Sequence, residues 1–593
     1  MRIILSSLLV ILSFWSFSQD NIQATVKDAK TKEPLQYCNI VIKSSGKGTI
    51  TNADGVFNIS VDSAKDSLQF YYMGYEIKTI SAVQLLQMNE IFLQKKDFEI
   101  QEITVYTDND YLYEILKKCR KNLKNNKTEH VSKVYYGLET QSKGKPIELV
   151  ECYYNGHFTG TNIDELRFKN GRTGHASKTE NYFLTLNSSK AFTLINLTSQ
   201  NGYFPFIPLQ FAKRRMKRKF NLEMENQDEN MYIINFSPYK NQQDYFSGKV
   251  WIEKGTFRLL KIDLSVENTN KHPFLPLFQF NSIHKVSFNI SKAYKKIGNE
   301  TVPEYINFKY SFKYKTDLDK AKTTAQLHNE IDRDISSKGI IYFYDFDKPF
   351  ILPYFEYDNN FSDYRKMSFI PYNEIFWNNN NKLLLTEKQK ENLGFFSQEG
   401  SLVNYREGNF GSNFLVLPIF DASFFLYKYY FWDATNRIQL VSDLHENKNN
   451  SRQLINNLSF QREFYNFKVQ ILLDICSLND TLQCKSYTVF DQNQTYFHLP
   501  TDSSTNPFIN IYFDIYEIER RKMQKKLNSE IFTIDQIDSY YELTLENLDK
   551  ISEQYLDEVQ MGKNQNSFEK WNKYILDRLG INNIEMFEKR DQE

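Results

Sequence analysis

Apolar and polar residues alternate in short runs through the first part of the chain, and turn residues separate these runs. Alternation at every second position over four to eight residues is typical of β-strands with one buried face. The strands that this pattern predicts are Ile22–Val26, Asn39–Ile42, Gly55–Ile59, Leu68–Tyr72 and Ile91–Leu93. We therefore expect residues 19–96 to form a small β-sandwich.

A connector of one strand and one helix is expected in residues 97–130. Phe98–Tyr106 alternates as a strand does, whereas apolar residues recur three or four positions apart through Tyr111–Leu123. The second spacing predicts an amphipathic helix, and its lysines and arginine form a basic outer face that we interpret as solvated.

The central and following regions favour further β-structure. Residues 131–345 are strand-rich, and their clearest hairpin joins Gly248–Ile252 to Phe257–Val266. Residues 346–400 form an irregular segment rich in aromatic residues and asparagine, and residues 401–530 are interpreted as a second β-rich region.

The last segment, residues 531–593, has the pattern of helices. Apolar residues recur three or four apart behind Thr533, which is a suitable N-cap, and a second helix is expected from Ser567 to a stop at Gly580. The predicted fold class is therefore mainly β and multi-domain, with an N-terminal sandwich, a β-rich middle region and a helical C-terminal tail.

The first eighteen residues have the organisation of a signal peptide. Arg2 gives a positive start, Ile3–Trp15 is apolar, and Ser16-Phe17-Ser18 places small residues before a cleavage point. The apolar run is shorter than the ~20 residues that span a bilayer, so a retained anchor is the weaker interpretation. We expect residues 1–18 to be removed and the mature protein to be exported.

Several turns and strands of the first domain carry a family resemblance. They are Thr25–Asp28, Glu33–Leu35, Asn39–Ile40, Gly48–Phe57 and Met73–Tyr75. This series resembles the carboxypeptidase-regulatory-like family, although Ala24 replaces a glycine often found there. The resemblance implies a transthyretin-like β-sandwich of the kind found at the front of exported Gram-negative envelope proteins, including TonB-dependent receptors. It covers residues 21–94 and implies no peptidase activity.

The region after this domain, including Tyr232–Pro238 and the predicted hairpin, resembles uncharacterised outer-membrane-associated envelope proteins. A fainter similarity is to the half-barrels that carry lipoproteins across the periplasm. Both resemblances imply a periplasmic or outer-membrane-associated location.

Charge and composition exclude some classes of protein. The 593 residues contain 73 Lys and Arg against 73 Asp and Glu, so the formal net charge is zero. A general nucleic-acid-binding protein would show a basic excess, and nucleic acid is therefore not an expected partner. Aromatic residues make up 16% of the chain, while glycine and proline are scarce, which favours β-structure with large packed side chains.

The sequence predicts no catalytic, cofactor-binding or metal site. The eight histidines form no zinc-binding pattern, there is no C-x-x-C, and G-x-S-x-G is absent. Thr51, Asn52 and Asp54 are interpreted as turn residues and not as calcium ligands. An acidic group before Arg520-Arg521, consisting of Asp514, Glu517 and Glu519, is interpreted as a charged surface where a strand meets a helix.

Two of the five cysteines could form a disulfide. Cys476 and Cys484 flank a predicted hairpin tip at Asn479-Asp480, where cross-strand neighbours lie within bridging distance. An exported protein would meet the oxidising conditions that such a bridge needs. Two unpaired thiols are the alternative, and the sequence leaves both open.

One run of basic residues stands out in a chain with no net charge. It consists of Lys213, Arg214, Arg215, Lys217, Arg218 and Lys219, and it follows the aromatic segment Phe204–Phe211. Cations beside aromatic rings suit contact with anionic headgroups or lipopolysaccharide phosphates, at ~1 kcal/mol for each cation near the surface. The alternative is a solvated basic face beside a buried Pro-aromatic loop.

These features favour a non-catalytic, exported binding or scaffold protein without a cofactor. The expected partners are an envelope protein or outer-membrane complex, with a lipid or lipopolysaccharide surface as a further possibility. Two alternatives remain from the sequence: a hydrolase whose active site is assembled from distant residues, and a periplasmic lipid or lipoprotein carrier with an apolar cavity in residues 131–314.

Overall fold

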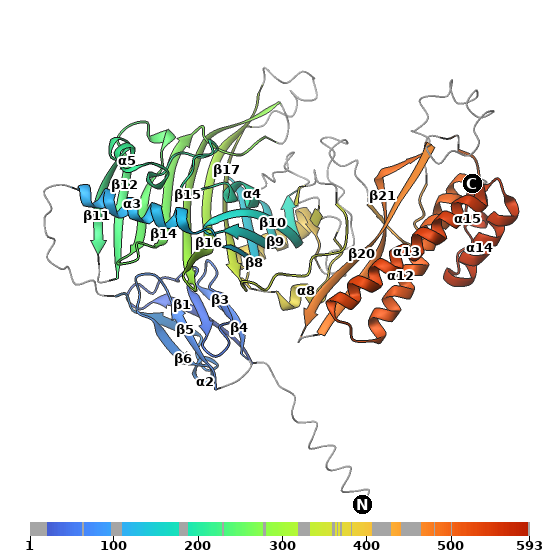
Figure 1. Cartoon of the computed structure of the whole chain (residues 1–593), viewed down its shortest axis with the longest axis horizontal. Helices are drawn as coiled ribbons and strands as arrows, with labels where there is room; N and C mark the ends of the chain where they lie inside the picture. The colour runs from blue at the N-terminus through green and yellow to red at the C-terminus, as the bar shows by residue number, and fades with distance from the viewer. Residues whose placement is uncertain are drawn as a thin grey trace, which may run out of the picture. The chain divides into compact units, whose positions relative to one another are not determined.

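The computed structural model divides into two compact units, the first comprising residues 1–350 and 362–418 and the second residues 351–361 and 419–593 (Figure 1). It describes residues 20–61, 65–96, 109–176, 188–227, 230–276, 280–317, 332–357, 362–363, 366–367, 370–380, 382–405, 429–439, 464–478, 481–497, 499 and 501–590. The predicted signal peptide, the expected strand Phe98–Tyr106 and the hairpin tip Asn479-Asp480 lie outside these residues.

The first unit begins with the predicted β-sandwich, formed by a three-stranded and a four-stranded sheet in the orders β4-β1-β7 and β3-β2-β5-β6. The elements are β1 (Asp20–Asp28), β2 (Asn39–Ile42), β3 (Gly48–Ile50), β4 (Val56–Val61), β5 (Ser67–Tyr71), β6 (Lys78–Ser81), α2 (Ala82–Leu85) and β7 (Glu90–Leu93). Alternate residues such as Val26, Ile40 and Phe70 are fully buried between the sheets. The five predicted strands are confirmed.

The predicted turn before β4 is present, and the side chain of Asn52, not that of Asp54, bonds to its backbone. Oδ1 of Asn52 accepts hydrogen bonds from the backbone N–H groups of Asp54 and Val56, both at 2.9 Å. Gly55 has a φ of +74°, a conformation that side-chain-bearing residues rarely adopt. Asn52 is therefore used as a turn residue.

An eleven-stranded sheet follows the sandwich, in the order β11-β12-β13-β14-β15-β16-β17-β8-β9-β10-β18. Its strands are β8 (Glu129–Ser142), β9 (Lys145–Thr159), β10 (Asn162–Ala176), β11 (Phe220–Gln227), β12 (Met231–Pro238), β13 (Ser247–Glu253), β14 (Leu259–Thr269), β15 (Asn281–Ile297), β16 (Glu300–Thr316), β17 (Asp332–Tyr344) and β18 (Gly400–Val403). All neighbouring strands are antiparallel. The predicted hairpin corresponds to β13 and β14, and Figure 1 shows the strands side by side from β11 toward β10.

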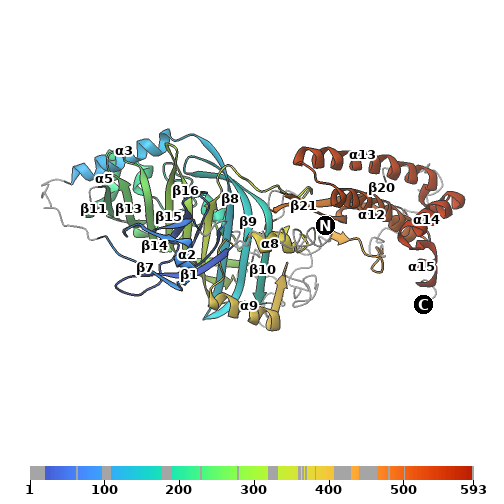
Figure 2. The same ribbon diagram turned by 90° about the horizontal axis from the view of Figure 1, so that it is seen from below.

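One face of this sheet is covered by helices and connecting segments, and we call it the covered face. The covering elements are α3 (Asp110–Asn125), α4 (Ser188–Thr193), η1 (Pro208–Gln210) and α5 (Lys213–Lys219); Figure 2 shows α3 along one side of the sheet. The fully buried ring of Phe192 stacks on Phe308 of β16, with ring centroids 3.9 Å apart. We call the other face, to which Lys309 belongs because it alternates with Phe308 and Tyr310, the opposite face.

Two short helices, α8 (Glu374–Asn379) and α9 (Glu387–Glu399), lie in the segment that was expected to be irregular. Thr386 caps α9 through a capping box with Gln389. Phe396 of α9 is fully buried against Leu149 and Ala176, so this helix covers part of the sheet near β9 and β10.

The second unit contains a three-stranded sheet and a group of helices. The strands are β19 (Tyr429–Phe431), β20 (Tyr465–Leu478) and β21 (Thr481–Phe497). The helices are α12 (Thr505–Ser529), α13 (Ile534–Val559), α14 (Gln565–Leu579) and α15 (Asn583–Arg590), and the short turn η5 (Gln560–Gly562) lies between α13 and α14. A similar short turn of the first unit is η2 (Gln242–Asp244). Thr533 forms the predicted N-cap, and Gly580 ends α14 with a φ of +74°. Among the described residues, no helix is long and apolar enough to cross a membrane.

The helix α12 differs from expectation, because its residues were assigned to a second β-rich region. Its first half, Phe508–Ile518, is apolar or aromatic around almost its whole circumference and is buried. A helix buried on all sides has no 3.6-residue periodicity, and its β-branched and aromatic residues are those that strands favour. The predicted class, mainly β with a helical C-terminal part, is nevertheless confirmed.

Candidate functional site: a basic surface on two helices

The predicted basic run forms the short helix α5, which is attached to the protein by one apolar side chain. Met216 is fully buried, whereas Arg214, Arg215 and Arg218 are exposed. The aromatic segment before the helix is largely buried; Phe204 and Phe211 belong to the core of the unit. The helix therefore presents its cations outward from an aromatic base.

Two of the six predicted cations are neutralised by the neighbouring helix α3. Nζ of Lys213 lies 2.6 Å from a carboxylate oxygen of Asp110 and 2.5 Å from one of Glu114, and Lys217 lies 2.5 Å from Asp110. The hydrogen bonds that Lys213 donates to Asp110 and Glu114 raise the pKa of Lys213. Hydrogen bonds from Lys213 and Lys217 lower the pKa of Asp110, and those from Lys213 and Lys117 lower the pKa of Glu114, so both carboxylates are charged at neutral pH.

Aromatic rings hold other cations of α5 by cation–π contacts. The guanidinium of Arg215 lies 4.8 Å from the ring centroid of Phe211, and Nζ of Lys219 lies 5.4 Å from that of Tyr245. These contacts orient the side chains without neutralising their charge. Arg214 and Arg218 form no ion pair with any described residue.

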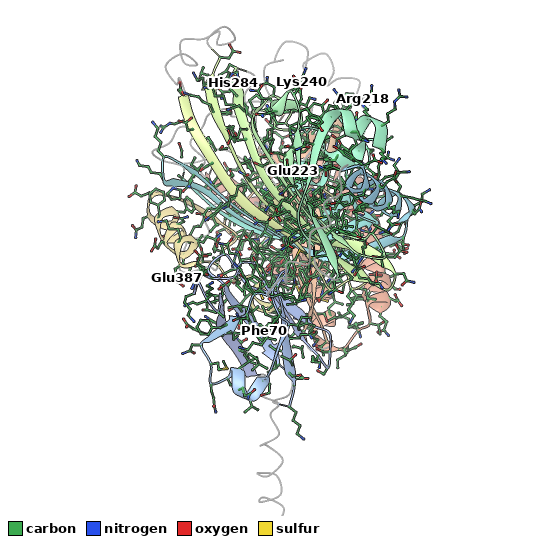
Figure 3. The ribbon with its side chains drawn as sticks, turned by 90° about the vertical axis from the view of Figure 1, so that its left-hand side faces the viewer. Phe70, Arg218, Glu223, Lys240, His284 and Glu387 are labelled. Carbon is green, nitrogen blue, oxygen red and sulfur yellow. The ribbon has the colours of Figure 1, made fainter. Side chains whose placement is uncertain are left out.

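The helix α3 adds its own cations to this surface, which we call the α3–α5 surface. The residues of α3 and α5 include eleven Lys and Arg against two acidic residues, a local net charge of +9. The exposed cations of α3 are Lys117, Lys118, Lys121 and Lys124. Figure 3 places Arg218 and Lys240 at the same end of the sheet, and Tyr239 bonds to the carbonyl of Lys219 at 3.1 Å. This end is strongly electropositive in a protein with no net charge.

The sequence identified half of this surface. It predicted the run in α5 and, separately, a basic outer face on α3, but no local pattern joins residues about a hundred positions apart. The signal that was available is the helical spacing of Asp110 and Glu114, which places both carboxylates on one face of α3. Only the packing of the two helices shows that Lys213 and Lys217 meet these carboxylates.

The second predicted site is a disulfide between Cys476 and Cys484, and the structure contains no bond between these two sulfur atoms. Cys476 lies opposite Gln483, and Cys484 lies opposite Ile475. Neighbouring positions on a strand point to opposite faces, so this register directs the two thiols away from each other. The strand register therefore favours the alternative without a bridge between Cys476 and Cys484.

The acidic group in α12 also differs from expectation, because it is buried and not on a charged surface. Asp514 is fully buried and Glu517 is 3% exposed. Nη2 of Arg437 lies 2.7 Å from Oδ2 of Asp514, and Glu517 bonds to Arg520 at 2.6 Å. These contacts give the carboxylates a structural role within the second unit. Among the described residues, no group of three or more His, Cys, Asp or Glu side chains could hold a metal ion.

The packing on the covered face of the central sheet tests whether an apolar cavity, which the lipid-carrier alternative requires, is open there. Phe192, Phe204 and Phe274 are buried there, and Phe274 lies 4.8 Å from Tyr310 between ring centroids. These rings pack within residues 131–314, the region in which the carrier alternative requires an apolar cavity. Lipid carriage would therefore require the covering segment to move.

Comparison with known proteins identifies the first domain. Residues 22–105 match the CarboxypepD_reg-like domain. This confirms the resemblance stated from the sequence. A segment of 98 residues, 16% of the chain, is 30% identical to TonB-dependent receptor P3 of Formosa agariphila, of which it spans only 10%.

Two solved structures resemble larger parts of the chain at low similarity. A LolA superfamily protein of Nitrosomonas europaea is 12% identical, with 40% of this chain and 94% of that one covered and a TM-score of 0.16. A putative outer membrane lipoprotein-sorting protein domain of Vibrio parahaemolyticus is 13% identical, with 40% and 92% covered and a TM-score of 0.18.

Proposed function

We propose that this protein is a non-catalytic binding or scaffold component of the cell envelope that attaches to an anionic surface through the α3–α5 surface. The observation that carries the proposal is the net charge of +9 on two packed helices of a chain whose total charge is zero. Such a concentration of unneutralised cations raises the local concentration of anionic partners.

The envelope location is supported by two observations on the N-terminal region. The first residues have the pattern of a signal peptide. The domain after them is similar to a segment of TonB-dependent receptor P3 of Formosa agariphila. We infer that the mature protein works in the periplasm or at the outer membrane, with an envelope protein or complex as its partner.

The geometry of the surface favours an extended anionic partner over a single small anion. Arg214 and Arg218 point outward from α5, and Lys118, Lys121 and Lys124 are exposed on α3. These cations belong to two helices, so they match distributed phosphates better than one point charge. At ~1 kcal/mol for each cation near an anionic membrane surface, five such side chains are sufficient for reversible attachment.

The proposal is tested by sedimentation of the mature protein with vesicles. We expect binding to vesicles that contain phosphatidylglycerol and none to pure phosphatidylcholine, because only the former supply a negative surface. The double variant Arg214→Glu/Arg218→Glu should lose most of this binding, and binding should fall steeply with added salt.

A matched control is the double variant Lys550→Glu/Lys573→Glu, which changes the net charge equally at exposed positions of α13 and α14. It should bind as the native protein does. Equal binding by both double variants, or binding that salt does not weaken, would show that the α3–α5 surface is not the attachment site.

A further inference from the structure

A polar hollow of about 300 Å³ lies on the opposite face of the central sheet, apart from the α3–α5 surface. Its lining includes Glu139, Asn289, Lys309, Ser311, Ser336 and Lys338, contributed by β8, β15, β16 and β17. These strands lie next to one another in the sheet. The hollow is therefore formed by side chains on rigid, paired backbone.

The register of the strands sets the side chains in two rows. Asn289 lies opposite Lys309, Lys309 opposite Lys338, and Lys338 opposite Glu139. In the next row, Ser287 lies opposite Ser311, and Ser311 opposite Ser336. Small hydroxyl-bearing residues thus lie beside a row of longer side chains, and the difference in length produces the hollow.

The charges in the first row do not balance. Nζ of Lys338 lies 3.1 Å from a carboxylate oxygen of Glu139, and the amide of Asn392 in α9 donates to the same carboxylate at 3.1 Å. Glu139 is thereby paired with one cation, Lys338. Lys309 forms no ion pair with any described residue, although it lies directly opposite Lys338. Like charges opposite each other on paired strands are destabilising, and a bound anion would relieve this repulsion.

Three further side chains of the hollow, Asn289, Ser311 and Ser336, can donate hydrogen bonds. Oδ1 of Asn289 accepts a hydrogen bond from Ser265 at 2.9 Å, which leaves the amide N–H groups of Asn289 available to a ligand. The hydroxyls of Ser311 and Ser336 form no hydrogen bond with any described residue. Two ammonium groups, an amide and two hydroxyls match the several oxygens of a phosphate.

From this arrangement we propose that the hollow binds a phosphate monoester of a small polyol. The phosphate contacts Lys309 and Lys338, and the serine hydroxyls together with Asn289 contact the remaining oxygens. The volume is at the lower end of that of small-molecule sites and exceeds what a bare phosphate fills, so the hydroxylated part of the ligand is held as well. A glycerol phosphate occurs free in solution as a monoester, and the headgroup of phosphatidylglycerol presents the related diester.

Glycerol 3-phosphate is the probe for this site, measured with the mature protein by titration calorimetry and by thermal shift. We expect saturable binding, weaker binding of inorganic phosphate, and no binding of glycerol. Lys309→Gln should weaken the binding about tenfold or more, since it removes a charge-assisted hydrogen bond without leaving a partner unpaired. Ser311→Leu should abolish it by filling the hollow while keeping every charge.

Lys145→Gln is the matched control, because Lys145 is an exposed cation of the same sheet, at the β8–β9 turn and outside the hollow. It should bind like the native protein. Binding no tighter than about 10 mM, or equal binding by Lys309→Gln and Lys145→Gln, would overturn the proposal.

The source of the ligand is distinguished with phosphatidylglycerol vesicles and protein that carries Arg214→Glu/Arg218→Glu. Residual vesicle binding that Lys309→Gln removes would assign the hollow to lipid headgroups, whereas binding of glycerol 3-phosphate alone would assign it to a free metabolite. The soluble probe does not depend on the α3–α5 surface, so failure of the hollow and failure of the proposed attachment are separate results.

Discussion

The α3–α5 surface and the helix α12 are both rich in charged side chains, but the key charges of α12 are buried and paired, whereas several on the α3–α5 surface are exposed and unpaired within the described part of the chain. In α12, Asp514 and its partner Arg437 have fully buried side chains, and Asn583 and the indole N–H of Trp432 complete the hydrogen bonds of the carboxylate. On α5, Arg214 and Arg218 are exposed and have no ion-pair partner among the described residues. The first arrangement joins three segments of the chain, and the second leaves charge available to a partner.

The difference shows that the role of a charged side chain depends on whether groups of the protein or molecules outside it complete its hydrogen bonds. A buried carboxylate costs several kcal/mol of desolvation, so it persists only where the fold supplies its partners. An exposed guanidinium has no such cost and gains little from a partner in water. Charge that the protein leaves unpaired at its surface is therefore the charge that can be used for binding.

The largest effect is expected from breaking the buried pair. Asp514→Ala leaves the guanidinium of Arg437 buried without its carboxylate, and we expect the second unit to lose about 3–5 kcal/mol of stability. Hydrogen exchange in α12, measured by mass spectrometry, reports this loss as faster opening. Asp577→Ala, at an exposed position of α14, is the control. Equal protection of α12 in both variants would mean that the pair is not stabilising the unit.

The carboxyl of Glu148 is a third case, because it is buried like that of Asp514 but has no cationic partner among the described residues. Glu148 of β9 is buried and accepts a hydrogen bond from Thr140 at 2.8 Å, and no Lys, Arg or His among the described residues pairs with it. Burial raises its pKa to about 8, against an ordinary value of 4.5. Between these two pH values the folded protein holds a proton that the unfolded chain has released. The contribution of Glu148 to stability therefore falls as the pH rises from 4.5 to 8.

We accordingly expect Glu148→Gln to be more stable than the native protein at pH 9, by on the order of a few kcal/mol, and about equally stable near pH 4. Urea denaturation across this pH range measures the difference. Glu129→Gln, at an exposed position of β8, should show no such pH dependence. A constant difference between the native protein and Glu148→Gln at every pH would contradict the assignment of a raised pKa to this group.

The comparison also explains what the sequence could predict. The strands of the sandwich were found because each buries one face and exposes the other, which leaves a two-residue period. The sequence of the first half of α12 shows no such periodicity, because a helix that is buried on all sides has apolar residues all around its circumference. The register between strands cannot be predicted from the sequence for a similar reason. Lys309 lies opposite Lys338 because of the way β16 and β17 pair, and no residue in either strand specifies this pairing alone.

The candidate site was predictable to the extent that it is local. Six consecutive or near-consecutive cations of α5 are visible in any reading of the chain. Their neutralisation is not, because Lys213 meets Asp110 across 103 positions. The same limit applied to Asp514, whose partner Arg437 is 77 positions away. In both cases the sequence shows the charged residue, but only tertiary packing determines whether its charge is paired within the protein or remains available to a partner.

The smallest effect is expected at Lys213, which lies between the two extremes of the comparison. Its ammonium contacts Asp110 and Glu114, but these carboxylates remain substantially exposed to water. Lys213→Gln should therefore lower the melting temperature by no more than about 2 °C at low ionic strength, and this loss should vanish in 1 M NaCl, where screening acts over about 3 Å. Lys550→Gln, an exposed cation of α13, is the reference for changes unrelated to the pair. A loss as large as that of Asp514→Ala, or one that persists in 1 M NaCl, would place Lys213 with the buried, structural charges.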